Sequence, residues 1–421
     1  MSALRRSLSD WLEWQERLNP RAIELGLDRS RTVADRLGLL PPACVTATIG
    51  GTNGKGSSAT LAACIWQAAG YKVGRYLSPH LLRYNERIAI DGVDASDEAI
   101  CASFAAIDAA RGDLPLTYFE FGTLAALWLF REARVDVQVL EVGLGGRLDA
   151  VNIVDADAAL VTNIGLDHTD WLGPDREAIG VEKAGIFRPG RPAICAEISP
   201  PASLRQQASR IAARWQQAGV DFVASRDGDR WHWRASDVRH AALPLPALPG
   251  AMQIDNAAGV LALVTALADR LPVGRAAIEA GLRGLSLPGR YQRVAGLIVD
   301  VAHNLESAAV LVEQLRADDN GGGVTRVVLG MLSDKPVAAV CARLAGVASR
   351  FYCAGLPPPR GLPAERLLEM AAASGVPASG HDNVALALAA ARADAGPKDR
   401  IVVCGSFLTV AAALEEARWG S

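Results

Sequence analysis

The sequence predicts an α/β protein, with a doubly wound sheet domain of the P-loop type followed by a smaller Rossmann-like α/β domain. First, the β-branched run 44–49 leads through a glycine-rich loop into an alanine-rich helix at 59–69. Second, strand-like and helix-like runs alternate along the chain, which is typical of parallel sheets. Third, 421 residues exceed one ordinary core, so we expect two domains.

Composition narrows the class of protein. Half of the residues are hydrophobic, but no apolar run approaches the ~20 residues of a membrane span, and the first residues do not resemble a secretory signal. The seven cysteines form no Cys-x-x-Cys pair, which favours small core residues in a reducing compartment. A net charge of −3 without a basic stripe disfavours nucleic-acid binding. We therefore expect a cytoplasmic protein with no nucleic-acid or membrane partner.

The glycine-rich loop at 50–58 has the composition of a phosphate-binding loop. Its small residues let backbone amides approach phosphate oxygens, while the following helix adds partial positive charge and Lys55 adds a full one. An ordinary βα turn is the alternative, but Lys55 and Ser57 follow in the P-loop order. The loop departs from the common pattern at Ile49, where glycine is usual, and at Gly56, which delays the hydroxyl.

The variant Gly-Thr-Asn-Gly-Lys-Gly-Ser resembles the ATP loop of the Mur ligase superfamily, above all that of the folylpolyglutamate synthase and dihydrofolate synthase family. Further motifs match this family in order, and the resemblance covers nearly the whole chain. They are Ser-Pro-His with Tyr-Asn-Glu-Arg-Ile at 78–88, Gly-Leu-Gly-Gly-Arg-Leu-Asp-Ala at 143–150, Pro-Gly-Arg-x-Gln at 288–292 and Asp-x-Ala-His-Asn at 300–304.

A segment with proline and glycine at 288–289 marks the expected boundary between two domains. Residues 1–287 are expected to form an ATP-binding domain of the Mur ligase central type that also holds the pterin site. Residues 288–421 are expected to form a C-terminal, Rossmann-like glutamate-ligase domain.

Polar residues at the ends of three predicted strands suggest a magnesium site. Ser78 follows a short strand, Glu141 lies at the end of the strand 136–142, and His168 follows the strand 159–164. A carboxylate near a P-loop is well placed to hold Mg²⁺. A turn serine and a core histidine are the ordinary alternatives, whereas the resemblance implies that all three residues are metal ligands.

Lys183 is a solvated helix lysine by pattern alone. The resemblance implies that it carries a carbamate made with CO₂, which would bridge a second Mg²⁺. Carbamylation requires an amine that is neutral often enough to attack CO₂, as a buried amine can be. The expected cofactors are therefore ATP and two Mg²⁺ ions, with a monovalent cation as a further candidate.

Three segments carry the pterin-site expectations. Thr117 and Glu120 have capping-box spacing, and the resemblance adds their segment to a pterin pocket of the kind that accepts dihydropteroate. Residues 26–29 form a turn by pattern and a pterin contact by resemblance, and residues 147–149 lie near the folate by resemblance. The expected contacts are Gly26, Leu27, Asp28, Arg29, Thr117, Tyr118, Phe119, Glu120, Arg147, Leu148 and Asp149.

The resemblance also assigns nucleotide and glutamate contacts. Asn256, by pattern a residue near a helix cap, would reach the adenine, and Ser406 is a helix N-cap in the alternative interpretation. The expected ATP contacts are Gly54, Lys55, Gly56, Ser57, Ser58, Asn256, Arg290 and Asp300. The expected glutamate contacts are His303 and Ser406. The expected catalytic residues are Lys55, His168, Lys183, Arg290 and His303.

Residues 200–249 are less informative. They predict a helix over 202–218, an exposed hairpin strand at 231–234 that gives His232 no role, and an extended linker at 243–246. A helix is expected at 257–268.

The resemblance implies an ATP-dependent carboxylate–amine ligase. It would join L-glutamate to dihydropteroate and to tetrahydrofolate through an acyl phosphate, and we expect a monomer. A monofunctional dihydrofolate or folylpolyglutamate synthase is the alternative within the family. A peptidoglycan ligase would need a uridine-nucleotide domain before the loop at residue 50, which leaves too little chain. A P-loop NTPase or kinase, the alternative of another class, would hydrolyse ATP regardless of glutamate and pterin.

Overall fold

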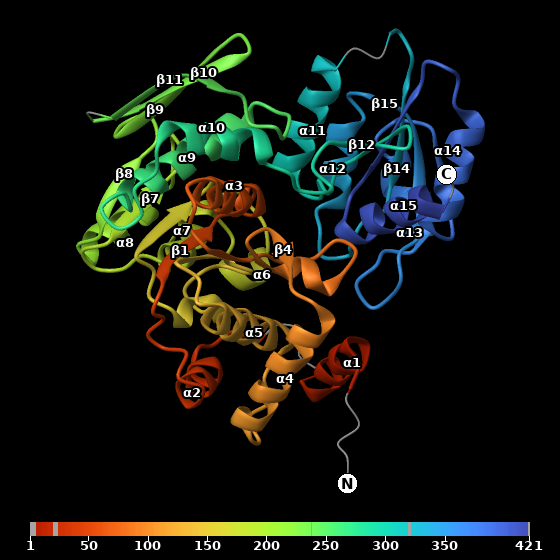
Figure 1. Ribbon diagram of the computed structural model, residues 1–421. Coiled ribbons are helices and arrows are strands. Elements are labelled where there is room, and N and C mark those ends of the chain that lie inside the picture. Colours follow the sequence, from red (N-terminus) through yellow and green to blue (C-terminus); the bar gives the residue numbers. More distant parts are fainter. Residues whose placement is uncertain (1–5, 20–23, 237, 319–320, 420–421) are drawn as a thin grey trace. The chain divides into compact units, whose positions relative to one another are not determined.

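The computed structural model describes residues 6–19, 24–236, 238–318 and 321–419 (Figure 1). The chain divides into two compact units. Unit 1 is Met1–Ala247 with Gln253–Ser286, and unit 2 is Leu248–Met252 with Leu287–Ser421. Both units combine mostly parallel sheets with helices, which confirms the predicted α/β class. None of the helices in the described ranges has the length and apolar character needed to cross a bilayer.

Unit 1 contains an eight-stranded sheet in the order β4-β3-β2-β5-β1-β6-β7-β8. The six strands from β2 to β8 in this order run parallel, and β3 and β4 extend one edge in antiparallel fashion. Every residue of β1 is buried between β5 and β6, so the loop after β1 begins near the middle of the sheet. The strands are β1 (Val45–Gly50), β2 (Val73–Tyr76), β3 (Ile88–Ile90), β4 (Val93–Asp94), β5 (Val137–Glu141), β6 (Ala158–Val161), β7 (Pro192–Cys195) and β8 (Arg214–Gln217).

The helices of unit 1 form from apolar patterns with local start signals. Thr117 and Glu120 make the predicted capping box at the start of α5, where ten residues are buried. The helices are α1 (Leu8–Leu18), α2 (Asp28–Arg36), α3 (Lys55–Ala68), α4 (Asp97–Arg111), α5 (Tyr118–Ala133), α6 (Thr169–Leu172), α7 (Arg176–Ala184), α8 (Ala202–Arg210), α9 (Met252–Ala266), α10 (Arg275–Gly284) and the 3₁₀ helices η1 (Tyr84–Arg87) and η2 (Ala150–Ile153).

Three expectations for residues 200–249 are partly wrong, although a helix does begin at residue 202 and residues 231–234 do lie in a hairpin strand. The helix predicted over 202–218 ends at Arg210, because residues 214–217 join the large sheet as β8. Trp231 and Trp233 are buried rather than exposed, and their indole N–H groups donate to the carbonyls of Pro244 and Ala258 at 2.9 and 3.1 Å. Unit 1 contains a second, antiparallel sheet, which consists of β9 (Phe222–Asp227), β10 (Arg230–Ala235) and β11 (Val238–Pro244). The linker predicted at 243–246 begins inside β11.

Unit 2 contains a six-stranded sheet in the order β12-β13-β17-β14-β15-β16. Only β12 is antiparallel to its neighbour, so the ends of β13, β17 and β14 meet along one edge. The strands are β12 (Gln292–Val294), β13 (Leu297–Val299), β14 (Thr325–Leu329), β15 (Ala348–Ala354), β16 (Ala378–His381) and β17 (Arg400–Cys404). The helices are α11 (Leu305–Ala317), α12 (Val337–Leu344), α13 (Ala364–Ala372), α14 (Val384–Asp394) and α15 (Phe407–Trp419).

The packing of α10 against α3 gives a first prediction. A Cβ added at Gly281 would lie 2.5 Å from Ile65 Cγ1 and 2.8 Å from the Ile65 backbone nitrogen, so Gly281→Ala must push α10 away from α3. We expect a loss of ~1–3 kcal/mol in the free energy of unfolding, measured by urea denaturation. Gly284→Ala on the same helix is the control, because a Cβ there meets nothing within 4 Å. Equal stability of the two variants would contradict this packing.

Candidate active site

The loop between β1 and α3 has a backbone that only glycine accommodates at two positions. Gly51 has a φ of 144°, and a Cβ there would lie 1.8 Å from Thr162 Oγ1. Gly54 precedes α3 with a φ of 80°, and its Cβ would lie 2.5 Å from Asn256 Oδ1. Asn256 therefore contacts the loop from the second turn of α9, rather than lying near the helix cap as its pattern indicated.

Polar groups at the end of β6 hold this loop in place. The Thr52 and Asn53 amides donate to the backbone and side-chain oxygens of Asn163 at 2.9 and 2.8 Å. The Thr162 hydroxyl donates to the Asn53 carbonyl at 2.6 Å. Our sequence analysis did not identify these supports, although two polar residues directly after a buried strand are a visible signal.

Two lysine amines donate to the carbonyl of Gly51. Lys55 Nζ lies 3.1 Å from this oxygen and 3.1 Å from the Thr52 carbonyl, and Lys183 Nζ lies 2.8 Å from the Gly51 oxygen. Lys183 is only 3% exposed, so the solvated lysine suggested by its pattern is wrong.

Burial and, to a smaller extent, the charge of Lys55 lower the pKa of Lys183 to about 7, although Asp167 and Asp149 oppose the shift. A large fraction of Lys183 is therefore neutral at pH 7.

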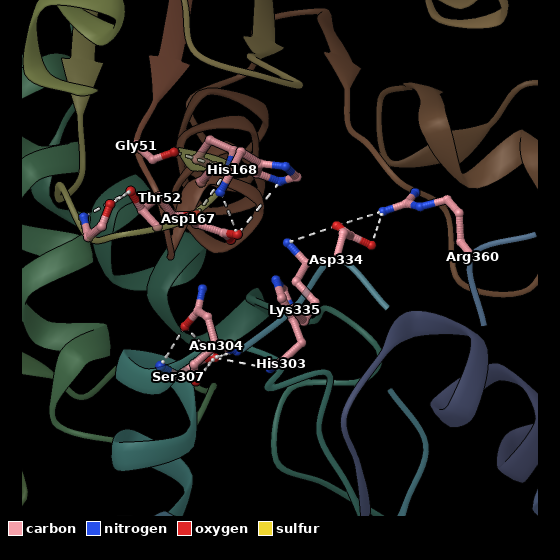
Figure 2. A network of polar contacts seen from close by, with 12 residues as sticks. Gly51, Thr52, Asp167, His168, His303, Asn304, Ser307, Asp334, Lys335 and Arg360 are labelled. Carbon is pink, nitrogen blue, oxygen red and sulfur yellow. Dashed lines mark hydrogen bonds and ion pairs between the residues drawn. The ribbon is translucent and has the colours of Figure 1, made fainter. Parts of the chain in front are cut away.

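Two of the expected metal ligands are in contact. The Ser78 amide donates to Glu141 Oε2 at 3.0 Å, and Glu141, at the end of β5, is 5% exposed. His168 lies before α6 with a φ of 52°, and its Nε2 is 3.9 Å from Asp167 Oδ1 (Figure 2). Within the described ranges, no three or more His, Cys, Asp and Glu side chains are grouped to hold a metal. Any site here must therefore draw on other groups, such as a hydroxyl or a modified lysine.

The three pterin segments of the sequence analysis lie together in unit 1. Glu120, 2% exposed, accepts hydrogen bonds from Arg29 Nε at 3.2 Å, the Ser30 hydroxyl at 3.1 Å and the Thr117 amide at 2.7 Å. The Gly26 amide donates to the Leu148 carbonyl at 3.3 Å, which joins the first segment to the third. The turn expected at 26–29 is partly wrong, because Asp28 and Arg29 open α2.

An aromatic wall and a buried carboxyl follow from this arrangement. The Phe119 ring lies 6.0 Å from that of Tyr76 and also packs so closely on Gly143 that a Cβ there would be 2.6 Å from Phe119 Cζ. Asp149 accepts the amides of Leu144 and Val151 at 2.8 and 3.0 Å. Burial raises the pKa of Asp149 to about 6.

Two further members of these segments, Arg147 and Tyr118, are more exposed than Asp149, and Leu27 is the N-cap residue of α2. Arg147 is about half exposed and forms an ion pair with Glu182 at 2.8 Å. Tyr118 is partly buried, with its ring 5.6 Å from that of Tyr84.

In unit 2, Asp300 organises the segment that carries Arg290. Its two oxygens accept the amides of Tyr291 and Ala302, both at 2.8 Å, and burial raises its pKa. The Arg290 guanidinium lies 5.3 Å from the centre of the Phe407 ring. Asp300 thus fixes the backbone beside Arg290, which was not apparent from the sequence.

The expected glutamate contacts follow neighbouring strands of unit 2. His303 Nδ1 is 2.8 Å from the Val301 carbonyl, after β13. After β17, the Ser406 hydroxyl accepts a hydrogen bond from the Thr409 amide at 3.1 Å. Ser406 therefore makes the N-cap contact of the alternative interpretation.

A lysine after β14 was not identified from the sequence. The Lys335 side chain is 5% exposed, and its amine is 3.9 Å from Asp334. Figure 2 shows that Asp334 also pairs with Arg360, at 3.1 Å.

Comparisons with known proteins now identify the family. Residues 49–264 match the Mur ligase middle domain, and residues 289–407 match the Mur ligase glutamate ligase domain. The dihydrofolate synthase/folylpolyglutamate synthase of Escherichia coli K12 is 48% identical over 97% of this chain and 95% of that protein.

Two solved structures extend the similarity to the fold. E. coli FolC in complex with DHPP and ADP has a TM-score of 0.94 and 47% identity, over 99% of this chain and 98% of that one. A bifunctional folylpolyglutamate synthase/dihydrofolate synthase with Mn, AMPPNP and L-glutamate bound has a TM-score of 0.90 and 45% identity, over 98% of both chains. The chain therefore belongs to the bifunctional dihydrofolate synthase/folylpolyglutamate synthase family of Mur ligases, which are ATP-dependent acid–amino-acid ligases of folate metabolism.

Proposed function

We propose that this chain joins L-glutamate to dihydropteroate and to tetrahydrofolate glutamates, using ATP and a divalent metal. The observation that carries the proposal is the pair of lysine amines on the Gly51 carbonyl, at the start of a glycine loop that opens a helix. Such a loop can bind phosphate through its backbone amides, and a buried amine with a lowered pKa is typical of a functional site.

The reaction must turn a poor acyl donor into a good one. A free carboxylate has no usable leaving group, so the γ-phosphate of ATP is transferred to it and an acyl phosphate forms. The glutamate amine then attacks the acyl carbon and phosphate leaves. Lys55, the loop amides and the N-terminus of α3 offset the charge on the phosphates, and Gly54, Gly56, Ser57 and Ser58 form the rest of this binding surface.

We assign the divalent metal to Ser78, Glu141, His168 and the carbamate of Lys183. The buried carboxylate of Glu141, in contact with Ser78, fits a hard cation, because carboxylate and hydroxyl oxygens are its usual ligands. When bound, the metal neutralises phosphate charge and orients the γ-phosphate.

The carbamate on Lys183 follows from the electrostatics of the two lysines. Two ammonium groups on one carbonyl repel each other, and CO₂ reacts with the neutral amine that this repulsion and burial favour. The product carries a negative charge, so repulsion from Lys55 becomes attraction.

We assign the substrates to both parts of the chain. Residues 1–287 hold ATP, with Asn256 near the adenine, and hold the pterin at the three segments joined by Glu120 and Leu148. Residues 288–421 supply Arg290 and Asp300 to the nucleotide, and His303 and Ser406 to glutamate. We further propose that the protein is a cytoplasmic monomer, which size-exclusion chromatography with light scattering would test.

Substrate omission tests the ligase reaction. Steady-state ADP release should require both dihydropteroate and glutamate, with product mass increased by one glutamyl unit, because the acyl phosphate forms only on the pterin substrate and the glutamate amine consumes it to permit the next turnover. Repeating the assay with tetrahydrofolate separates the bifunctional enzyme from a monofunctional one. Unchanged ADP release when each substrate is omitted would instead indicate an NTPase or kinase.

Lys55→Ala tests the phosphate loop. We expect both ligase activities to fall at least ~100-fold, because a charge that stabilises transferring phosphate is lost, while the melting temperature changes little. Steady-state kinetics and a thermal melt measure both quantities. Near-normal turnover would contradict the role of this ammonium.

Lys183→Met tests the burial of the second amine, in CO₂-depleted buffer without nucleotide or metal. The pKa of Lys183 is about 7 in the folded chain but ~10.4 when unfolded, so the unfolded state binds more protons and wild-type stability rises with pH between these values. Methionine is uncharged, so the variant avoids the cost of burying an ammonium group. The variant should therefore be more stable than wild type at pH 6, by an amount of the order of 1–4 kcal/mol, and the difference should shrink by pH 9.

Denaturant melts at both pH values measure this difference. Equal stability at pH 6 would refute a strained, buried ammonium. The same variant should lose ligase activity, and ¹³C NMR of wild type in ¹³C-bicarbonate should show a carbamate signal that is absent from Lys183→Met.

A further inference from the structure

Arg87 is a buried cation that the proposed mechanism leaves without a role. It ends η1 and is 8% exposed. Its Nε donates to His80 Nδ1 at 2.8 Å, and its guanidinium lies 5.2 and 5.4 Å from the ring centres of Tyr84 and Tyr118. No carboxylate of the described residues forms an ion pair with it.

Aromatic rings offset only part of the cost of burying this charge. A cation–π contact is weak compared with the cost of removing a charge from water. The guanidinium carries five N–H donors, of which the hydrogen bond to His80 uses one, and the Tyr76 hydroxyl is a second polar partner, so donors remain. Arg87 is therefore suited to an acceptor group supplied by a ligand.

The contacts of His80 fix the direction of the guanidinium. Because a guanidinium can only donate, His80 Nδ1 must accept, and the ring proton lies on Nε2. The imidazole thus holds the Nε side of Arg87. The remaining donors lie on the two terminal nitrogens, near the Tyr76 hydroxyl, and a ligand acceptor can be bound there.

The surroundings of Arg87 are continuous with the proposed pterin pocket. Tyr118 and Phe119 are consecutive in α5, and Phe119 lies against Tyr76. A Cβ built on Gly143 would meet both Phe119 Cζ at 2.6 Å and Asp149 Oδ2 at 3.2 Å, so the buried carboxyl lies beside the same ring. One aromatic wall therefore carries an acceptor, Asp149, and a donor, Arg87.

A pterin presents complementary groups. Its 2-amino group and N3–H donate, and its 4-oxo oxygen accepts, all within one plane. We propose that Arg87 donates to the 4-oxo oxygen of the bound pterin and selects 4-oxo over 4-amino rings, with His80 as a positioning residue. This inference rests on the proposed function and names the group that recognises its pterin substrate.

The test compares Arg87→Met and Arg87→Lys with wild type. We expect the KM for dihydropteroate to rise about 20- to 100-fold in Arg87→Met, because a buried donor to the substrate is lost, with the KM values for ATP and glutamate and the saturated kcat within about 3-fold. Arg87→Lys keeps the charge but loses the planar fork, so its KM should rise about 10-fold. Fluorescence titration with dihydropteroate alone should show the same loss of affinity.

Specificity gives the second readout. Wild type should prefer dihydropteroate over its 4-amino analogue, and this preference should shrink at least 10-fold in both variants. Arg111→Met is the control, since Arg111 on α4 has a side chain only 12% exposed and also lies against an aromatic ring, 5.1 Å from the centre of Trp14, but it pairs with Asp108 and is not among the pocket residues.

The outcomes separate the two proposals. A wild-type protein that forms no glutamylated product would refute the proposed function itself. An active wild type with an unchanged dihydropteroate KM in Arg87→Lys, or in a folded Arg87→Met, would overturn the role of Arg87. So would an equal loss in Arg111→Met, or a preference for the 4-oxo ring that persists in the variants.

Discussion

The candidate active site of unit 1 depends on one backbone carbonyl that accepts hydrogen bonds from two lysine amines. The oxygen belongs to Gly51, which has a φ of 144° and lies so close to Thr162 that no side chain would fit. Only glycine can therefore hold the carbonyl in this position, where both amines reach it. Lys55 and Lys183 come from sequence positions far apart, yet the charge of Lys55 contributes to the lowered pKa of Lys183. This constraint links the loop conformation to the lowered pKa of Lys183, and through it to the carbamate and the metal that we propose.

The parallel sheet explains why the other proposed site residues of unit 1 follow strands that end at the same edge as β1. Ile49 at the end of β1 lies in register with Glu141 at the end of β5, and β2 leads to Ser78 on the other side of β5. Parallel strands bring their carboxyl ends to one edge, where polar side chains are tolerated beyond the buried strand. Unit 2 repeats the principle, since His303 and Ser406 follow the adjacent strands β13 and β17.

Local patterns in the sequence predicted the loop, the capping box of Thr117 and Glu120, and most strands that lead to site residues. They failed where contacts between distant residues determine burial or the end of a helix. The burial of Trp231 depends on a strand partner that supplies the Pro244 carbonyl, and the end of α8 depends on β8 joining a distant sheet. Arg87 could not be recognised either, because its isolation from carboxylates is a property of the folded chain.

The central claim is that ATP activates the pterin carboxylate before glutamate attacks. Isotope transfer tests it most directly, with dihydropteroate labelled by ¹⁸O in both carboxylate oxygens. The account predicts that each phosphate released in a turnover carries one ¹⁸O atom, because the oxygen that joins carbon to phosphorus leaves with phosphate while the amide keeps the other. Unlabelled phosphate accompanying labelled amide product would contradict it.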